Sequence, residues 1–405
     1  MALYEKLEYE LEFITPAFIG GAFPDKEAEL RPASFIGILR WWFRNLALTV
    51  TDNLEAIYKL ESELFGNTER AGKVWVKFGE LKRFEYQPLS ESKEGIDSNL
   101  AYLGYGVFNY INCAKKKHQL KYPQVCKILP ELKGFMNTKA FIPAGEKVKV
   151  AFLVPSKYRT LMENLLYLVS QLGTIGGRSR RGWGSFHLHP KGKKNYWNSE
   201  ALNEAINFFK NELLKLTEVE EKPFQTINVY IKKLQKGNAL DTLKKLGGDY
   251  RSFRSLLQPD YFQAKNFLTK RHRFKTLIYN RAWFGLPIKI QYRSLNGKGA
   301  TINLFEGKEH RRLASPLLFK VVKSENGKYD VVLILMNRPE FIEQNGKFYS
   351  WSFGQTRKVL IKADKDKTIK PKPVVMNQSL HNCIIETFLK GHLKAEEVLS
   401  WGEIK

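Results

Sequence analysis

The chain has 405 residues, with 66 Lys and Arg against 41 Asp and Glu, so its formal net charge is +25. An excess of this size indicates a polyanionic partner, either a nucleic acid or an anionic membrane surface, unless the chain is simply a basic soluble protein. The length predicts two or three domains, and the absence of an apolar run of about 18 residues or of a signal-peptide pattern argues against a membrane-spanning or secreted protein.

The cysteine content also argues against a secreted protein. Only three cysteines occur, Cys113, Cys126 and Cys383, and none of them forms a CxxC pair. This usage is typical of a reducing cytoplasm and argues against structural zinc or a disulfide framework. We therefore expect a cytoplasmic protein.

The first half of the sequence alternates between strand and helix patterns. Strand periodicity, with apolar and polar residues alternating, and amphipathic helix periodicity follow one another in the order βαββαβ. The expected elements are a strand at 3–13, a helix from Pro32, strands at 73–78 and 146–154, a helix at 155–172 and a strand at 182–190, with a long irregular insertion before residue 146. This order predicts a ferredoxin-like, RRM-like unit opened by insertions.

The stretch GTIGGRSRRGWGSF, residues 173–186, joins the second helix to the fourth strand, and we call it the glycine-arginine loop. No GK[ST] occurs and the loop precedes a strand, which excludes a P-loop and a Rossmann fingerprint. We expect a flexible loop whose exposed amides and arginines hold a nucleic-acid backbone, with a tight turn and solvated arginines as the alternative. Its predicted RNA-binding residues are Gly176, Gly177, Arg178, Arg180, Arg181 and Trp183.

The first helix adds a second group of predicted contacts. One broad stripe of it is apolar and predicts the core-facing side, which includes Trp42. Arg40 and Arg44 point away from that stripe, one turn apart, and Trp41 lies on their side. Arg40, Trp41 and Arg44 are therefore predicted to face RNA, or in the case of Trp41 a protein partner.

The open face of the first sheet is not expected to bind RNA. In a ferredoxin-like sheet the third strand lies beside the first, so Lys147 and Lys149 can pair with Glu8, Glu10 and Glu12. That face would neutralise itself.

Three segments contain no carboxylate at all: 98–130, 173–199 and 261–305. The last of them has nine lysines or arginines and nine aromatic residues. Basic groups can follow a phosphate backbone while aromatic rings stack on unpaired bases, so the pattern favours RNA or single-stranded DNA. The predicted RNA-binding residues in this half are Arg271, Arg273, Arg293, Arg311 and Arg312.

The second half repeats the strand and helix patterns more loosely. Strands are expected at 226–234, 287–293, 317–323 and 329–336, and helices at about 239–257 and 378–392. We predict an N-terminal domain at 1–192, a helical connection at 193–224 and a second, ferredoxin-like domain at 225–405. The fold class is therefore α+β, with two ferredoxin-like units in tandem.

Several motifs together carry a family resemblance. The stretches TPAFIGGA, ELRPASFIGILRWWFR, ESELFGN and GTIGGRSRRGWGSF, in that order, resemble the RAMP superfamily of CRISPR proteins. LRPASFIGILRWWFR, with RAWFGLP and RRLASPLLFKV further on, resembles the first RAMP subunit of the type III-B (Cmr) effector complex. The resemblance implies two ferredoxin-like units, binding of guide and target RNA, assembly with other RAMP subunits, and a part in antiviral defence.

Catalytic patterns are weak. His187 and His189 share a strand face without a third ligand nearby, and no HExxH, DxD cluster or GxSxG stands out. We expect no metal, no cofactor and no enzymatic activity. The alternative is a metal-independent, guide-processing RAMP endoribonuclease with His272 as acid or base, and a membrane-surface protein is a third class that the βαβ context of the first helix disfavours.

Overall fold

The computed structural model describes residues 3–402, apart from 81, 271–275, 307–308, 338–340, 345–346, 351–356, 365–369 and 376–380. The chain divides into two compact units. The first contains Met1–Gly248, Leu318–Ile334 and Glu396–Lys405, and the second contains Asp249–Leu317 and Leu335–Ala395. The chain is a mixed α+β protein, as predicted.

The first sheet of the first unit has four antiparallel strands in the order β3-β7-β1-β8. Their bounds are β1 Tyr4–Phe13, β3 Trp75–Phe78, β7 Lys147–Pro155 and β8 Phe186–Pro190. The expected strand positions are thus confirmed to within a few residues, and the third predicted strand does lie beside the first. Glu10 faces Lys149 and Glu12 faces Lys147 across that pair. Lys147 Nζ lies 3.2 Å from Glu10 Oε1, so this face is self-neutralised as expected.

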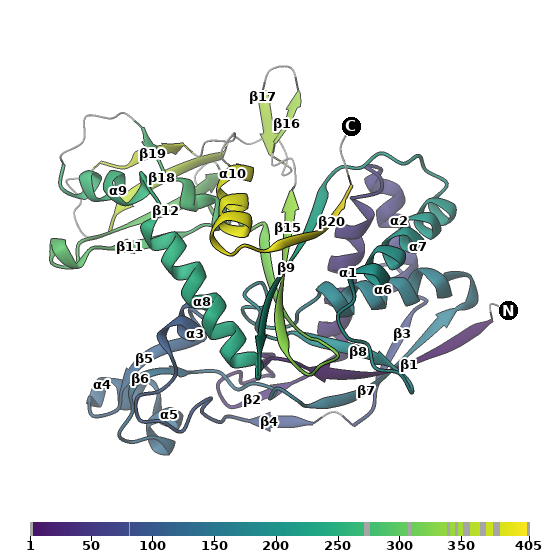
Figure 1. Cartoon of the computed structure of the whole chain (residues 1–405), viewed down its shortest axis with the longest axis horizontal. Coiled ribbons are helices and arrows are strands. Elements are labelled where there is room, and N and C mark those ends of the chain that lie inside the picture. Colours follow the sequence, from purple (N-terminus) through teal and green to yellow (C-terminus); the bar gives the residue numbers. More distant parts are fainter. Residues whose placement is uncertain are drawn as a thin grey trace. The chain divides into compact units, whose positions relative to one another are not determined.

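Four helices lie on one side of this sheet, the first and third packed against its strands and the other two packed against those helices (Figure 1). They are α1 Pro32–Ala47, α2 Leu54–Phe65, α6 Arg159–Leu172, which follows a 3-10 turn at Ser156–Tyr158, and α7 Ser199–Thr217. Proline occupies the first turn of α1, where its missing N–H costs nothing. The Asn53 and Asn198 side chains cap α2 and α7 by accepting backbone N–H bonds. Phe35 of α1 packs against Phe152 and Phe186 of the sheet, which fixes how the helix sits on it.

The insertion between β3 and β7 is regular, which corrects the expectation of an irregular segment. A hairpin of β5 Phe108–Asn112 and β6 Lys133–Asn137 carries two short helices, α4 Lys116–Lys121 and α5 Pro123–Ile128. Before the hairpin, β4 Arg83–Glu85 pairs with β2 Glu27–Glu29, and α3 spans Ser98–Leu103. The apolar residues of this segment are scattered in sequence and gather only on folding, around Ile111, Val125, Leu132 and Met136.

A disulfide joins Cys113 and Cys126 within the same insertion. One disulfide therefore forms, although the cysteine usage argued against a disulfide framework. Twelve residues separate the two cysteines, and that spacing carries no recognisable pattern, because α4 and α5 bring the side chains together through tertiary folding.

A second four-stranded sheet has the order β14-β15-β9-β20. Its strands are β9 Thr226–Lys236, β14 Leu317–Lys323, β15 Tyr329–Asn337 and β20 Glu396–Trp401, and α8 Ala239–Leu256 follows β9. Nearly every residue of β14 and β15 is buried, which explains why both strands read as continuous apolar runs in the sequence. The strands expected at 226–234, 317–323 and 329–336 are confirmed.

The second unit is built on a sheet with the order β10-β19-β18-β12-β11, to which β13 adds on β12. The strands are β10 Leu277–Ile278, β11 Ile288–Gln291, β12 Gly299–Glu306, β13 Glu309–Arg311, β18 Arg357–Ala363 and β19 Lys372–Val375, with a hairpin of β16 Phe341–Gln344 and β17 Lys347–Ser350. Its helical segments are α9 Asp260–Leu268, 3-10 turns at Asn280–Phe284 and Arg293–Leu295, and α10 His381–Glu386, which continues as a π-helix over Thr387–His392. Among the described residues, no helix is long and apolar enough to cross a membrane.

Candidate nucleic-acid interface

The glycine-arginine loop is a hairpin in which several backbone amides donate hydrogen bonds to carbonyl oxygens of the same chain. Thr174 and Ser185 form an antiparallel bridge, and the Ile175 amide donates to the Gly184 carbonyl at 2.9 Å. The Gly177 amide donates to the Phe18 carbonyl at 2.8 Å, so the loop also lies along the segment after β1. The expected flexible loop of exposed amides is therefore corrected: the backbone bonds to its own protein.

The glycines serve close packing within the chain. A Cβ on Gly176 would lie 2.8 Å from the Phe18 carbonyl oxygen, and one on Gly184 would lie 1.8 Å from that of Ile175. Gly176 and Gly184 also have φ of +92° and +67°, which side chains disfavour. Gly177 has Phe18 3.4 Å from its Cβ position. Gly176 thus owes its identity to its backbone conformation and the approach of Phe18, which corrects the expectation that it serves the approach of RNA, whereas a Cβ on Gly177 would make only ordinary contact.

Strand β14 of the second sheet holds the loop in place. The Phe319 amide donates to the Arg180 carbonyl at 3.2 Å, and the Val321 amide donates to Ser185 Oγ at 3.0 Å. Between them, Lys320 is fully buried, and its Nζ donates to the carbonyls of Gly173 and Phe186, the first and last residues of the loop. A strand some 140 residues away in sequence therefore fixes both ends of the loop, a dependence that no local pattern signals.

Each loop arginine lies over an aromatic ring. The distances from guanidinium carbon to ring centroid are 5.7 Å for Arg178 over Tyr105, 5.5 Å for Arg180 over Trp41, and 5.2 Å for Arg181 over Phe319. These are cation–π distances, and a neutral ring orients a guanidinium without cancelling its charge. Arg178 is exposed and the other two are half-buried. The loop thus presents ordered positive charge.

Trp41 connects the loop with the first helix. It is half-buried, its ring meets Trp42 edge-on at 5.1 Å, and Arg180 lies over it. Trp42 is 1% exposed, so its predicted core position is confirmed. The structure therefore brings together Arg180 and Trp41, which the sequence predicted as RNA contacts on two separate elements.

Trp183 is a core residue, which corrects its assignment as an RNA-stacking residue. Its side chain is fully buried and packs against Phe18 and Phe108 at 5.5 and 5.1 Å between ring centroids. The hairpin turns Trp183 inward while the arginines of the same loop face outward. A base has no access to that ring.

Arg40 and Arg44 of α1 share a carboxylate that sequence reasoning missed. Arg40 Nε donates to Glu61 Oε1 at 2.7 Å, and Arg44 Nε lies 3.6 Å from Glu61 Oε2. Glu61, on α2, is 2% exposed, whereas Arg40 and Arg44 side chains are 30% and 52% exposed. The sequence did contain a signal for this pairing, since Glu61 falls on the core-facing side of the amphipathic pattern of α2. Buried carboxylates are nearly always paired, so a cationic partner could have been predicted.

The other predicted residues belong to the second unit or lie outside the described residues. Arg311 ends β13 and pairs with Glu309 at 3.1 Å, and Arg312 is exposed. Arg293 opens a 3-10 turn. Arg271, Arg273 and His272, the candidate acid or base, lie outside the described residues.

The histidines below the loop are engaged by the protein. The Asn195 amide donates to His189 Nδ1, so the other ring nitrogen, Nε2, donates to Glu12 at 3.0 Å. The Lys323 amide donates to His187 Nε2. Burial lowers the pKa of His187 well below its usual range, and burial does the same to the pKa of Lys320. Over the described part of the chain, no three His, Cys, Asp or Glu side chains gather as a metal site would need.

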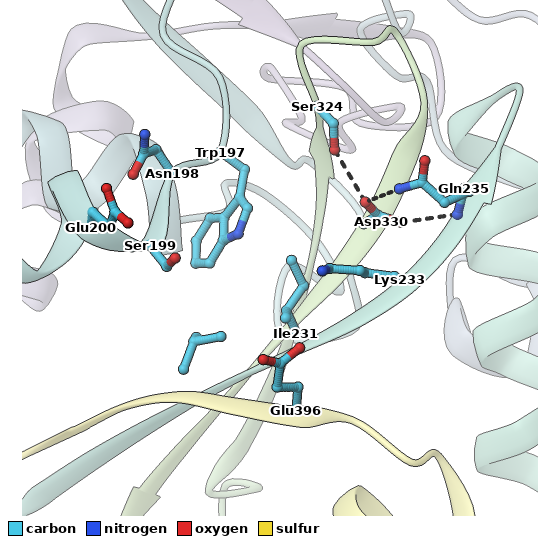
Figure 2. Close-up of a pocket in the computed structure, with 11 residues that line it drawn as sticks. Trp197, Asn198, Ser199, Glu200, Ile231, Lys233, Gln235, Ser324, Asp330 and Glu396 are labelled. Atoms are coloured by element: carbon cyan, nitrogen blue, oxygen red, sulfur yellow. Dashed lines mark hydrogen bonds between the residues drawn. The ribbon is translucent and has the colours of Figure 1, made fainter.

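A cavity of about 430 Å³ lies at the start of α7, against β9, β15 and β20 (Figure 2). Trp197 and Lys233 line it together with Glu200, Asp330 and Glu396. Asp330 already accepts bonds from the Leu234 and Gln235 amides and from Ser324 Oγ. Three carboxylates around one lysine disfavour a phosphate there, so this cavity is a poorer RNA site than the loop.

Known proteins resemble this chain in sequence and in fold. Residues 10–187 match the RAMP superfamily model. The chain is 26% identical over 340 residues to the CRISPR system Cmr subunit Cmr1-1 of Pyrococcus furiosus, covering 80% of this chain and 86% of that protein. It is 29% identical over 195 residues to subunit Cmr1-2 of the same organism, covering 46% of this chain and 96% of that one. The crystal structure of apo Cmr1 from Pyrococcus furiosus has a similar fold, with a TM-score of 0.50 at 17% identity over 97% of this chain and 98% of that one. The predicted resemblance is confirmed: the chain is similar to the RAMP superfamily over residues 10–187 and, over most of its length, to Cmr1 subunits of CRISPR systems.

Proposed function

We propose that this protein is an RNA-binding subunit of a type III-B CRISPR effector complex, acting in antiviral defence beside other RAMP subunits. The similarity to Cmr1-1 over 86% of that protein supports the assembly. The observation that carries RNA binding is the row of three loop arginines held over Tyr105, Trp41 and Phe319. Arginine forks bind phosphate oxygens bidentately, so this surface suits the backbone of a guide or target RNA.

The proposed contacts are Arg178, Arg180, Arg181 and Trp41, with Arg40 and Arg44 beside them. Arg311 and Arg312, together with Arg271, Arg273 and Arg293, form the proposed set in the second unit. We propose a cytoplasmic protein with two ferredoxin-like domains, 1–192 and 225–405, joined through 193–224. In support, both four-stranded sheets order their strands as second, third, first, fourth of a βαββαβ series.

We propose that the subunit is non-catalytic. The histidines nearest the loop among the described residues, His187 and His189, are buried and bonded to protein groups, so neither is available to act on an RNA at the loop. Purified protein with labelled guide RNA, with and without magnesium or manganese, should leave the RNA intact. Specific cleavage that is lost in His272→Ala would favour the endoribonuclease instead.

The test of RNA binding is the double variant Arg180→Ala, Arg181→Ala in the full chain. Phosphate neutralisation releases counterions, so each lost contact should lower the slope of log affinity against log salt by about 0.7 for single strands. We expect weaker binding of single-stranded RNA, a slope flatter by roughly 1–1.4, and little change in sequence preference. Fluorescence anisotropy at several salt concentrations measures this on protein shown by melting to be folded. An unchanged slope would remove the loop from the RNA surface.

A further inference from the structure

The helical part of the insertion presents lysines that form no salt bridge with the described residues. The segment 98–130 contains no carboxylate, and no salt bridge to these side chains occurs among the described residues. All of them are exposed: Lys115, Lys116, Lys117, Lys121 and Lys127. We call this group the insertion lysines. On the first sheet, by contrast, Lys147 and Lys194 lie 3.2 and 3.1 Å from Glu10.

The insertion lysines stand on a fixed platform. The Cys113–Cys126 disulfide holds the two Cα atoms 5.3 Å apart, so the start of α4 and the end of α5 lie together. The Asn112 amide donates to His118 Nδ1 at 2.8 Å, and Gln119 Nε2 donates to the Cys113 carbonyl at 2.8 Å. Lysines on both helices are therefore gathered at one end of the β5–β6 hairpin.

This surface is continuous with the glycine-arginine loop. Arg178 lies over Tyr105, immediately before β5, and Phe108 at the start of β5 packs on Trp183. From there the five residues of β5 lead to the insertion lysines over a distance of about 17 Å. Tyr105 is 70% exposed and Tyr110, on β5, is 49% exposed, which places two aromatic rings along this path.

We propose that the insertion lysines bind the phosphates of a single-stranded RNA that continues from the glycine-arginine loop along β5. Exposed aromatic rings next to a group of exposed cations are a combination that holds single strands, since rings stack on bases while cations follow the backbone. An anionic membrane is a poorer fit, because α4 and α5 have six residues each and neither presents a long apolar face. The proposal rests on the proposed RNA-binding function and extends its surface.

The test compares two single-stranded RNAs, of about 4 and about 16 nucleotides, the range of site sizes for single-strand-binding domains. The variant is Lys116→Gln, Lys117→Gln, Lys121→Gln, Lys127→Gln in the full chain. For the longer RNA we expect a salt slope flatter by up to about 2.8, four contacts at about 0.7 each. The shorter RNA, held by the loop arginines alone, should bind unchanged.

A matched control removes four charges from the acid-paired face: Lys6→Gln, Lys147→Gln, Lys191→Gln, Lys194→Gln. These lysines pair with Glu8 or Glu10, so the control changes the net charge equally but should leave the slope for the longer RNA nearly as it is. An equal flattening of the salt slope in the control would overturn the proposal, because it would show that the effect comes from the change in net charge alone.

The outcomes also separate this proposal from the function on which it rests. If the insertion variant binds the longer RNA normally while Arg180→Ala, Arg181→Ala weakens it, the extended path is wrong and the loop remains the RNA site. If neither variant changes binding, both proposals fall. Loss of binding to vesicles of phosphatidylserine and phosphatidylcholine, with RNA binding intact, would overturn the RNA assignment in favour of a membrane surface.

Discussion

The arginines of α1 and those of the glycine-arginine loop lie close to one another yet are held in different ways. Arg40 and Arg44 meet the buried carboxylate of Glu61. Arg180 lies over the ring of Trp41, and Arg181 lies over that of Phe319. A carboxylate orients a guanidinium and cancels one charge, whereas a ring orients it and leaves the charge in place.

This difference separates structural from binding arginines within one patch. Glu61 neutralises one of the two positive charges that Arg40 and Arg44 place on α1. Because the Glu61 carboxylate is buried, the stability of the fold depends on its pairing with these arginines. The loop arginines are oriented by contacts with neutral rings, which do not themselves cancel a charge. The loop arginines should therefore dominate phosphate binding, and those of α1 should contribute more to the fold.

The tryptophans give the largest expected effect. Trp183 of the loop is fully buried, so Trp183→Ala should lower the free energy of unfolding by about 3–5 kcal/mol, the usual cost of removing a core aromatic side chain. Trp41→Ala, at a half-buried position under Arg180, should fold nearly normally and weaken RNA binding, since the ring that orients Arg180 is lost. Denaturant unfolding and anisotropy titration measure the two quantities.

Trp42→Ala is the control for this pair, because Trp42 lies next to Trp41 on the helix but is buried. It should behave as Trp183→Ala does. A stable Trp183→Ala protein with weak RNA binding would show that the ring faces RNA, and it would reverse the contrast between the two faces of the loop.

The sequence predicted these elements better than the contacts between them. The βαββαβ order, the core position of Trp42 and the pairing of β7 with β1 follow from periodicities of two and 3.6 residues, which are local properties. The inward turn of Trp183 depends on Phe18 and Phe108, which lie 165 and 75 residues away. Lys320 likewise bonds to residues 147 and 134 positions away. The partner of Glu61, 21 residues away, and the two cysteines, 13 residues apart, are nearer in sequence, but they too meet only when separate helices pack together.

Glu61→Gln tests the comparison directly and should have an intermediate effect. Glutamine keeps an oxygen for Arg40 but removes the charge, so we expect the free energy of unfolding to fall by about 1–3 kcal/mol, as for a weakened buried hydrogen bond to a charged group. RNA binding should become tighter and its salt slope steeper by up to about 0.7, because the helix gains one net positive charge. Weaker RNA binding by the folded variant would instead mean that Glu61 positions Arg40 for the RNA.

The smallest effect, expressed per pH unit, concerns Lys320, the buried lysine that bonds to both ends of the loop. Burial holds its pKa well below the ordinary value of 10.5. Between these two pKa values the unfolded chain binds one proton more than the folded chain, so the free energy of unfolding rises with pH in that window. One proton gives a rise of at most about 1.4 kcal/mol per pH unit, and below the folded-state pKa the contribution becomes constant.

Lys320→Met should remove this rise, because methionine fills a similar volume and does not titrate. The difference in stability between the two proteins, measured by urea unfolding from about pH 7 to about pH 10, isolates Lys320 from the tyrosines that both proteins share. His187 beside it titrates on the acid side and does not enter this window. We expect Lys320→Met to bind RNA less tightly at neutral pH. The carbonyls of Gly173 and Phe186 lose their hydrogen-bond donor, so the ends of the loop no longer hold the arginines between them in place. A stability difference that does not vary with pH would mean that the lysine keeps its proton in the folded protein. In that case a charged ammonium group holds the two ends of the loop through carbonyl oxygens, whereas aromatic rings hold the arginines between them.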